Sequence, residues 1–392
     1  MHYLEIGGAE TALIGLLHAL DYSKYNVDLF LHSHRGEMMA FIPKEVNILP
    51  KIPAYAQIER PLKMVLKERY YRIALARIWA KMRTKWYLKR HPAKESTAGL
   101  QYVANAVTSL LPAINPDVEY DLAISFLQPH NFVLKKVRAK KKVCWIHTDY
   151  SVVDVNARQE LPVWDSFDNI VSISDDVTKT FLQTFPSLSA KIVKIENILS
   201  PTLVRQRADE FEPEDFFNHR KKCIRLLSVG RFTTAKNYDN VPDICRRIDS
   251  LGITDLKWFI IGYGPDEQLI RAKIQEAGMD EHVILLGKKT NPYPYIKACD
   301  IYLQPSRYEG KSVTVREAQL LCKPVIITNY NTAASQVRDG IDGIIVPMDN
   351  QGCAEGIVRF IKDKAKQDEI IQSLKMSDYG NENEVEKLYK LV

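Results

Sequence analysis

Short apolar runs alternate with stretches of helical spacing along most of the chain. In the first half, apolar runs predict strands at residues 27–32, 121–126, 142–146, 169–173 and 192–195. Between them, apolar residues recur every three or four positions, which predicts helices over 9–20, 129–138 and 175–185. Strands and helices that alternate in this way form a parallel sheet with right-handed crossovers, so the pattern predicts an α/β fold.

The same alternation starts again in the second half. Strands are predicted at 224–229, 257–261, 283–286, 301–303, 324–328 and 343–346, with helices between them and a further helix over 353–362. Residues 198–222 lose the apolar periodicity and become charged, which is typical of a linker. Because 392 residues exceed one ordinary core, we expect two domains, 1–197 and 223–376.

A glycine pair stands close to the first residue of the sequence. Gly7 and Gly8 precede the first predicted helix, and only a stub of a strand fits before them. We therefore expect the first domain to lack its first strand. Glycines at a helix N-terminus accept phosphate or let a ligand approach closely, whereas the plainer interpretation is a simple turn.

The composition indicates a soluble globular protein. Its 54 basic and 48 acidic residues give a formal net charge of +6. Six cysteines are scattered without a Cys-x-x-Cys pair, which favours reduced core residues of a cytoplasmic protein over a disulfide framework or a zinc site. No secretory signal and no apolar run of bilayer length is visible.

Residues 60–94 form the most biased segment. Between Lys63 and Lys94 there are eleven lysines or arginines and one acid, Glu68, with aromatic residues interspersed at helical spacing. A basic amphipathic helix of this kind can lie on an anionic membrane surface. A solvated helix packed on its own domain explains the pattern equally well. Nucleic-acid binding ranks lowest, because no known motif for it accompanies the charge.

The richest candidate chemistry lies between two strands of the second half. Glu309 falls in a loop, and Glu317 falls seven intervening residues later in a helix. Both carboxylates then face the carboxyl end of a parallel strand, where open α/β sheets bind ligands. The amides of Lys311, Ser312 and Val313 would be open donors at the helix N-terminus. The group suits a ligand with many hydroxyls and some phosphate.

Two cations and a histidine extend this candidate site. Arg231 and Lys236 follow the first strand of the second half, and two fixed cations beside a helix N-terminus suit a diphosphate. His147 lies at the carboxyl end of a first-half strand, although a histidine there is more often structural. His32 and His34 share a strand face without obvious partners, so no metal site is predicted.

These residues carry a family resemblance. Ser-Val-Gly-Arg at 228–231 with Lys236, Ile-Gly-Tyr-Gly-Pro at 261–265, the Glu-x7-Glu stretch at 305–318 and Lys-Pro-Val-Ile at 323–326 resemble the retaining glycosyltransferases of the GT-B fold, family 4, or glycosyl transferases group 1. The resemblance covers the second half in order, and the glycine loop at Gly7-Gly8 is similar to that of the family's first domain. It implies two Rossmann-like domains that face each other across a cleft, with a helix in 377–392 that crosses back onto the first domain.

The resemblance also implies roles for the site residues. Arg231 and Lys236 would bind the donor diphosphate and stabilise its charge as it leaves. Glu309 would accept hydrogen bonds from sugar hydroxyls, Glu317 would hold the ribose, and His147 would contact the donor sugar. The remaining donor-binding candidates are Gly8, Gly230, Gly262, Gly310, Lys311, Ser312 and Val313. The sequence departs from the family at Lys311, often apolar there, and at Gln336, often acidic.

The expected reaction is transfer of a sugar from a nucleotide sugar, with uridine diphosphate as the preferred carrier. The chain contains no Asp-x-Asp, so we expect no metal and no other cofactor. No covalent nucleophile stands out. The family resemblance implies same-face attack with retention, in which the departing phosphate helps to deprotonate the acceptor. The expected acceptor is a growing glycan or lipid carrier in polysaccharide or lipopolysaccharide synthesis at the inner membrane face, without nucleic acid. The alternatives are a catalytically silent sugar-nucleotide-binding partner and a GT-B epimerase or phosphorylase.

Overall fold

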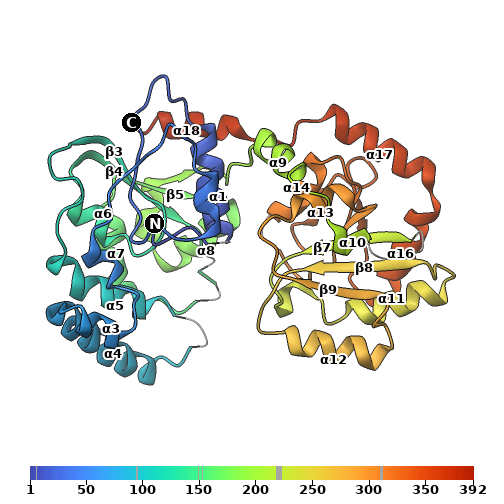
Figure 1. Ribbon diagram of the computed structural model, residues 1–392, viewed down its shortest axis with the longest axis horizontal. Coiled ribbons are helices and arrows are strands. Elements are labelled where there is room, and N and C mark those ends of the chain that lie inside the picture. The colour runs from blue at the N-terminus through green and yellow to red at the C-terminus, as the bar shows by residue number, and fades with distance from the viewer. Residues whose placement is uncertain (6, 94–95, 149, 152, 218–222, 310–311) are drawn as a thin grey trace. The chain divides into compact units, whose positions relative to one another are not determined.

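The computed structural model describes residues 1–5, 7–93, 96–148, 150–151, 153–217, 223–309 and 312–392. The chain forms two compact units, which are labelled by element in Figure 1. The first unit comprises Met1–Ile198 together with Asn381–Val392, and the second comprises Leu199–Gly380. Each unit is an α/β structure built on parallel strands. The predicted fold class is therefore confirmed.

The second unit is organised around a six-stranded parallel sheet in the order β12-β11-β10-β7-β8-β9. The central strands β7 and β10 are neighbours in the sheet. The chain continues from β7 to β8 on one side of this pair and from β10 to β11 on the other, so the loops that leave the two strands run to opposite sides. Ligands bind at such a switch point in open α/β sheets. The strands are β7 (Ile224–Val229), β8 (Leu256–Ile261), β9 (Val283–Gly287), β10 (Ile301–Gln304), β11 (Val325–Thr328) and β12 (Ile344–Val346).

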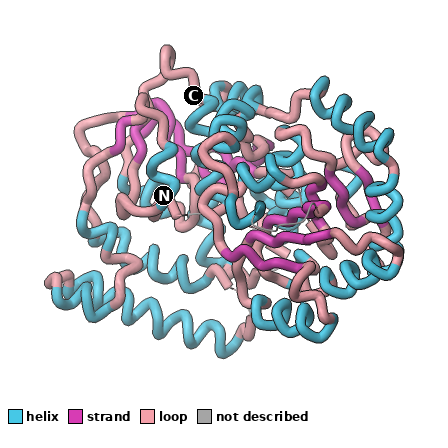
Figure 2. Tube along the Cα trace, turned by 45° about the vertical axis from the view of Figure 1, so that its right-hand side comes forward, coloured by secondary structure: helices cyan, strands magenta, loops and turns pink. Residues whose placement is uncertain are grey.

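Helices cover this sheet, and Figure 2 shows its strands lying among them. Successive residues of β8 enter two different core clusters: Trp258 packs in one and Phe259 in the other. Burial of both faces explains why these strands appear in the sequence as continuous apolar runs. The helices are α11 (Val241–Ser250), α12 (Glu267–Ala277), α13 (Tyr293–Ala298), α14 (Val313–Leu320), α15 (Ala333–Gln336), α16 (Asn350–Lys362) and α17 (Lys364–Met376).

The predicted linker differs from the structure. Residues 201–217 contain two short helices, α9 (Pro201–Ala208) and α10 (Glu214–Phe217), and both belong to the second unit. Val204 and Phe216 are buried in its core and anchor the two helices there. Charged residues surround these anchors, so the segment shows little apolar periodicity. Residues 218–222 lie outside the described part of the chain.

The first unit contains two parallel sheets. One has the order β3-β4-β5-β6 and the other pairs β1 with β2. The last helix, α18, belongs to this unit, where the Tyr389 hydroxyl accepts a hydrogen bond from the amide of Asp21. The strands are β1 (Asp28–Leu29), β2 (Asn47–Ile48), β3 (Tyr120–Ser125), β4 (Ala139–Ile146), β5 (Asn169–Ser172) and β6 (Ile192–Lys194).

Three helices of the first unit, α1, α6 and α8, lie where the apolar spacing predicts them. The first helix of the unit begins at Gly8, directly after the glycine pair, and its longest helix covers most of the basic segment. The helices of the unit are α1 (Gly8–Ala19), α2 (Pro53–Ala56), α3 (Leu62–Lys67), α4 (Tyr71–Arg90), α5 (Ala98–Val107), α6 (Asn131–Lys136), α7 (Ala157–Asp165), α8 (Asp175–Thr184) and α18 (Val385–Tyr389).

The residues before α1 form a short extended segment. The amide of Leu4 donates to the carbonyl of Arg35, and the amides of His32 and Ser33 donate to the carbonyls of Met1 and His2. Among the described residues, this segment is not one of the strands of either sheet.

Candidate functional site

The loops that follow β7 and β10 are tied together at the switch point of the second unit. The guanidinium of Arg307 forms two hydrogen bonds with the carboxylate of Asp239, at 2.8 and 2.7 Å, and a third with the carbonyl of Thr234, at 2.6 Å. The amide of Arg307 also donates to the carbonyl of Ala235. A planar, bidentate ion pair of this kind fixes orientation as well as distance, so the two loops form one rigid edge.

Lys236 and Glu309 meet across these two loops. Their Nζ and Oε1 atoms lie 2.5 Å apart, and both side chains are largely buried. Oε1 of Glu309 also accepts hydrogen bonds from the Ser306 hydroxyl at 2.7 Å and the Gln304 amide at 3.0 Å. Among the described residues, these three partners all contact Oε1. A carboxylate has two acceptor oxygens, so Oε2 can accept from a ligand hydroxyl. The structure therefore brings together two residues that the sequence placed in one site.

Two predicted donor-binding glycines serve the packing of these loops. A Cβ on Gly262 would lie 1.9 Å from the carbonyl oxygen of Gly230, and Gly262 has a φ of +157°. A Cβ on Gly230 would lie 2.8 Å from the hydroxyl of Tyr238. Gly262 allows the backbone after β8 to approach that after β7, whereas Gly230 leaves room for the side chains of Tyr238 and Lys236. Their residue type is thus explained by contacts within the protein, whether or not a ligand also lies against them.

The loop before α14 is held by Gln336. The Gln336 Oε1 atom accepts from the amide of Ser312 at 3.2 Å and from the Tyr330 hydroxyl at 2.8 Å. Its Nε2 atom donates to the carbonyl of Ser312 at 2.5 Å. The expectation of an open amide at Ser312 is therefore wrong. Val313 is the first residue of α14 and is exposed. Gly310 and Lys311 lie outside the described residues.

Glu317 lies in a separate hydrogen-bonded group. It is buried on α14, and its Oε1 atom accepts from the Tyr293 hydroxyl at 2.8 Å. Burial raises the pKa of Glu317 to about 7, against the opposing effects of the Tyr293 hydrogen bond and the positive charge of Arg207. The guanidinium of Arg207 lies over the Tyr293 ring, 5.2 Å from its centroid. Near neutral pH this carboxyl therefore holds a proton for much of the time.

Arg231 lies directly after β7, on the same edge as Lys236, and its side chain is exposed. The carbonyl of Arg231 accepts from the amide of Thr233, which begins the turn toward Lys236. An exposed guanidinium beside a partly buried ammonium provides two cations for an anionic group at this edge.

His147 lies at the end of β4 in the first unit, as predicted. Its ring packs on Phe126, with 4.6 Å between centroids. Burial lowers the pKa of His147 to about 4, so the imidazole is neutral near pH 7. Its Nε2 atom is buried and has no hydrogen-bond partner in the described part of the chain. This atom can exchange a hydrogen bond with a ligand.

Gly8 differs from the glycines of the second unit. It is exposed at the start of α1, and a Cβ there would meet nothing within 4 Å. Packing within the described part of the first unit does not require a glycine at this position, so a close approach of a ligand to Gly8 stays a prediction.

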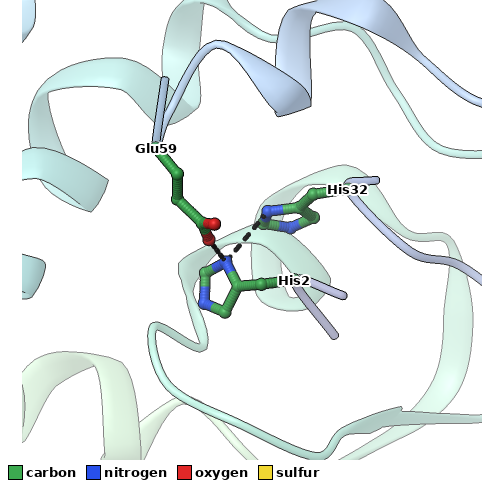
Figure 3. A group of neighbouring side chains, drawn as sticks. All are labelled: His2, His32 and Glu59. Carbon is green, nitrogen blue, oxygen red and sulfur yellow. Dashed lines mark hydrogen bonds and ion pairs between the residues drawn. The ribbon is translucent and has the colours of Figure 1, made fainter. Parts of the chain in front are cut away.

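A cluster that the sequence did not predict joins His2, His32 and Glu59 in the first unit (Figure 3). The Nδ1 atom of His2 contacts the Glu59 carboxylate and lies 3.1 Å from Nδ1 of His32. His2 Nε2 lies 3.1 Å from the carbonyl of Gln128, so this nitrogen must be protonated. Two imidazoles and a carboxylate can bind a divalent cation. The contact between His2 and Glu59 satisfies the same atoms without a cation.

The basic segment presents an outer face of mixed character. On α4, Ile73, Ala74 and Ala80 are buried, so one side of this helix packs on its own unit. The side chains of Trp79 and Trp86 are about half exposed. Arg83 and Arg90 lie over these two indole rings. Among the described residues, no helix is both long and apolar enough to cross a membrane.

Sequence reasoning missed the residues that position Glu309 and the loop before α14. Gln304 and Ser306 lie close to Glu309 in the sequence. Their polar side chains at the end of a buried strand could have indicated that they belong to the site. Gln336 was noted only as a departure from the resemblance. The role of Tyr293 had no local signal, because its contact with Glu317 is made between two helices.

The second unit matches a known family. Residues 210–376 match the model of the family described as glycosyl transferases group 1. The match includes the loops of β7 and β10 and the helix α14, so it covers the whole group around Lys236, Glu309 and Glu317.

Two characterised relatives show local similarity. The chain is 31% identical over 140 residues to the N-acetylgalactosamine-N,N'-diacetylbacillosaminyl-diphospho-undecaprenol 4-alpha-N-acetylgalactosaminyltransferase of Campylobacter jejuni, covering 35% of this chain and 37% of that protein. It is 27% identical over 154 residues to the UDP-Gal:alpha-D-GlcNAc-diphosphoundecaprenol alpha-1,3-galactosyltransferase of Escherichia coli, covering 38% and 40%. The matches thus span about two fifths of these relatives.

Solved structures resemble the whole chain. Anabaena Alr3699/HepE in complex with UDP and glucose has a TM-score of 0.64 at 15% identity, covering 100% of this chain and 97% of that one. WaaG, a glycosyltransferase involved in lipopolysaccharide biosynthesis, has a TM-score of 0.57 at 13% identity, covering 99% and 97%. At this level of identity the similarity shows the fold. The two-unit architecture is the GT-B fold.

Proposed function

We propose that this chain, whose residues 210–376 match the model of the glycosyl transferases group 1, moves a sugar from a nucleoside diphosphate sugar to a glycan or lipid-linked acceptor. The observation that carries the proposal is the Lys236–Glu309 pair at the switch point, with Arg231 in the same loop as Lys236. A cation suits the diphosphate, and an oriented carboxylate oxygen suits sugar hydroxyls. The two requirements of a nucleotide sugar therefore meet within one edge of the sheet.

The chemistry divides among these residues. As the bond between the sugar and the diphosphate breaks, negative charge develops on the leaving phosphate. Arg231 and Lys236 stabilise that charge, and fixed cations are effective because they require little reorganisation during the reaction. Glu309 orients the sugar through its hydroxyls. Glu317, protonated for much of the time, can both donate to and accept from ribose hydroxyls.

We infer a retaining, metal-independent reaction. The departing phosphate takes the proton of the acceptor hydroxyl on the same face from which it leaves, so Glu309 acts as a binding group and forms no covalent bond with the sugar. The two cations supply the charge stabilisation that a divalent metal gives in other transferases. His147 is neutral and serves as a hydrogen-bonding group for the sugar.

Uridine diphosphate is the proposed carrier, and a polyprenyl-linked glycan is the proposed acceptor. The Escherichia coli relative is named for a UDP-sugar, and both relatives are named for diphosphoundecaprenol substrates. The outer face of α4, with exposed indoles beside arginines, suits an anionic membrane surface where such acceptors are found. We therefore place the protein at the inner face of the membrane, in polysaccharide or lipopolysaccharide synthesis.

Thermal-shift measurements against a panel of nucleotide sugars test the proposal. A donor that binds the folded chain raises its melting midpoint with concentration. We expect a UDP-sugar to raise the midpoint and Lys236→Met to abolish that rise, whereas Lys273→Met, an exposed lysine on α12, leaves it unchanged. No shift with any UDP-, GDP-, ADP- or TDP-sugar would contradict the proposal.

A further inference from the structure

Three potential metal ligands from separate segments of the first unit meet at one point. His2 precedes α1, His32 follows β1, and Glu59 lies in the turn between α2 and α3. One ligand atom of each residue lies within 4.8 Å of those of the other two. Figure 3 shows that the Nδ1 atom of His2 faces both of its partners. Two imidazoles and one carboxylate form the ligand set of a three-ligand zinc site.

The spacing of these atoms fits one cation. In a tetrahedral zinc site with bonds of about 2.0 Å, neighbouring ligand atoms lie roughly 3.3 Å apart. The Nδ1 atoms of His2 and His32 lie 3.1 Å apart. The carboxylate of Glu59 contacts the same nitrogen of His2, and its side chain is 36% exposed and has room to turn. A small rotation of Glu59 then places all three ligand atoms around one ion.

The contacts of His2 Nδ1 compete with each other when no cation is bound. A ring nitrogen carries one proton or one lone pair, so it can make one linear hydrogen bond and not two. The contact with Glu59 and the contact with His32 therefore compete for the same nitrogen. A cation between the three atoms accepts a lone pair from each of them and removes this competition.

Hydrogen bonds hold the two histidines in this arrangement. Nε2 of His2 donates to the carbonyl of Gln128 at 3.1 Å, which leaves Nδ1 to face the other two ligands. Histidines that bind a metal almost always make such a bond with their second nitrogen. The amide of Ser33 donates to the carbonyl of His2 at 2.9 Å, so the segments that carry His2 and His32 are tied together by their backbones.

The turn that carries Glu59 is held by Arg77 of α4. The Nη1 atom of Arg77 donates to the carbonyl of Gln57 at 2.6 Å and to the carbonyl of Arg60 at 2.7 Å. These two carbonyls lie on either side of Glu59 in the chain. The backbone of the third ligand is therefore fixed as well, whereas its side chain keeps its freedom.

The surroundings of the cluster favour a transition metal. The ring of His32 is 7% exposed and packs on Tyr55 and Phe132, with centroids at 5.3 and 5.2 Å. Apolar rings thus shield one side of the cluster from water, and the exposed side chain of Glu59 gives an ion a path of entry. Nitrogen ligands suit zinc and its neighbours, whereas Mg²⁺ and Ca²⁺ prefer oxygen ligands.

We propose that His2, His32 and Glu59 bind one divalent transition-metal ion, with Zn²⁺ as the preferred ion. Water or a small ligand completes the tetrahedron. The ion links the segment before α1 to the turn after α2 and so stabilises the first unit. Lys236 and Glu309 belong to the second unit, and the transfer proposed above requires no ion at this cluster.

Zinc titration of the purified chain tests the proposal. The chain carries no polyhistidine tag and is first stripped of metal, and competition with a chromogenic zinc indicator gives the stoichiometry and the affinity. We expect one Zn²⁺ per chain, and binding at least about 100-fold weaker for Glu59→Gln and for His32→Gln. Glu45→Gln and His18→Gln change exposed residues of the same unit and should bind zinc as the wild type does.

Two further measurements use the same proteins. Co²⁺ in place of Zn²⁺ should give the intense visible absorption of a tetrahedral site in the wild type and not in Glu59→Gln. Zn²⁺ should raise the melting midpoint of the wild type, whereas Mg²⁺ should not. Because Glu59 is partly exposed, Glu59→Gln should melt at the wild-type temperature in the absence of metal, which separates loss of the site from loss of folding.

Equal zinc affinities of the wild type and Glu59→Gln would overturn the proposal and show adventitious binding only. Zinc binding that His18→Gln weakens as much as His32→Gln would place the ion elsewhere. A preference for Mg²⁺ over Zn²⁺ would contradict the nitrogen ligands. These titrations contain no nucleotide sugar, so their outcome leaves the proposed transfer to its own test.

Discussion

Lys236 and Glu309 form an ion pair in the site, and each holds the charged group of the other in position. Replacement of Lys236 by methionine removes the cation while keeping most of the side chain. We expect kcat/KM to fall by about 100-fold, or ~2.7 kcal/mol, which is typical of the loss of one preorganised charge-stabilising group. Steady-state kinetics with saturating acceptor measure this, with Lys273→Met as the control. An unchanged rate would remove Lys236 from the site.

Glu309 is proposed to bind the sugar without forming a covalent bond to it. Glu309→Ala should lower kcat at least about 100-fold, and the wild-type chain should carry no trapped glycosyl intermediate during turnover. Intact-mass spectrometry during turnover of a slow donor analogue checks this. A glycosylated peptide that contains Glu309 would contradict the same-face mechanism.

Glu317 makes the stability of the chain depend on pH. Its pKa is raised from about 4.5 in the unfolded chain to about 7 in the folded one, so the folded state binds more protons between these values. The stability linked to this group is therefore fully present below pH 4.5 and is lost as pH rises through 7. From pH 4.5 to 8, the wild type should lose about 3 kcal/mol relative to Glu317→Gln.

Denaturant unfolding of both proteins at a series of pH values measures this difference. Glutamine can still accept the hydrogen bond from the Tyr293 hydroxyl, so the variant keeps the packing of α14. A difference that does not change with pH would show that Glu317 is ionised at the same pH in the folded and unfolded chains.

At the scale of secondary structure, we expect α4 to bind an anionic membrane surface. Its inner side packs on the first unit, whereas Trp79 and Trp86 are exposed beside arginines. We expect the chain to cosediment with vesicles that contain phosphatidylglycerol, and Trp79→Ser with Trp86→Ser to weaken this at least about tenfold. Leu269→Ser, an exposed apolar residue on α12, is the matched control. Equal binding by all variants, or binding insensitive to salt, would contradict the role of α4.

The strands and helices show how far sequence reasoning extends. Strands such as β7 and β8 were predicted to within a residue, because burial on both faces leaves continuous apolar runs. The helices α9 and α10 were taken for a linker, because their few buried residues are surrounded by charge. Short elements whose stability comes from tertiary packing have little signal of their own.

The sequence predicted only the part of the candidate site that follows from strand order. Glu309, Lys236 and Arg231 stand at the ends of strands, and the topology of a parallel sheet brings such ends together. The hydrogen bonds between Gln336 and Ser312 join α15 to the loop before α14. The sequence of neither segment predicts these bonds. Contacts made by side chains of separate loops depend on the folded structure.

At the scale of the whole molecule, the proposed function requires turnover of a nucleotide sugar. The decisive experiment incubates the purified chain with UDP-sugars and a polyprenyl-diphosphate-linked glycan, with and without a metal chelator, and measures UDP release and labelled product. We expect one UDP-sugar to be consumed with formation of an α-linked product, at the same rate in chelator, and the rate to be about 100-fold lower for Lys236→Met. Binding of UDP-sugars without turnover, or turnover that the chelator abolishes and added metal restores, would contradict the proposed reaction.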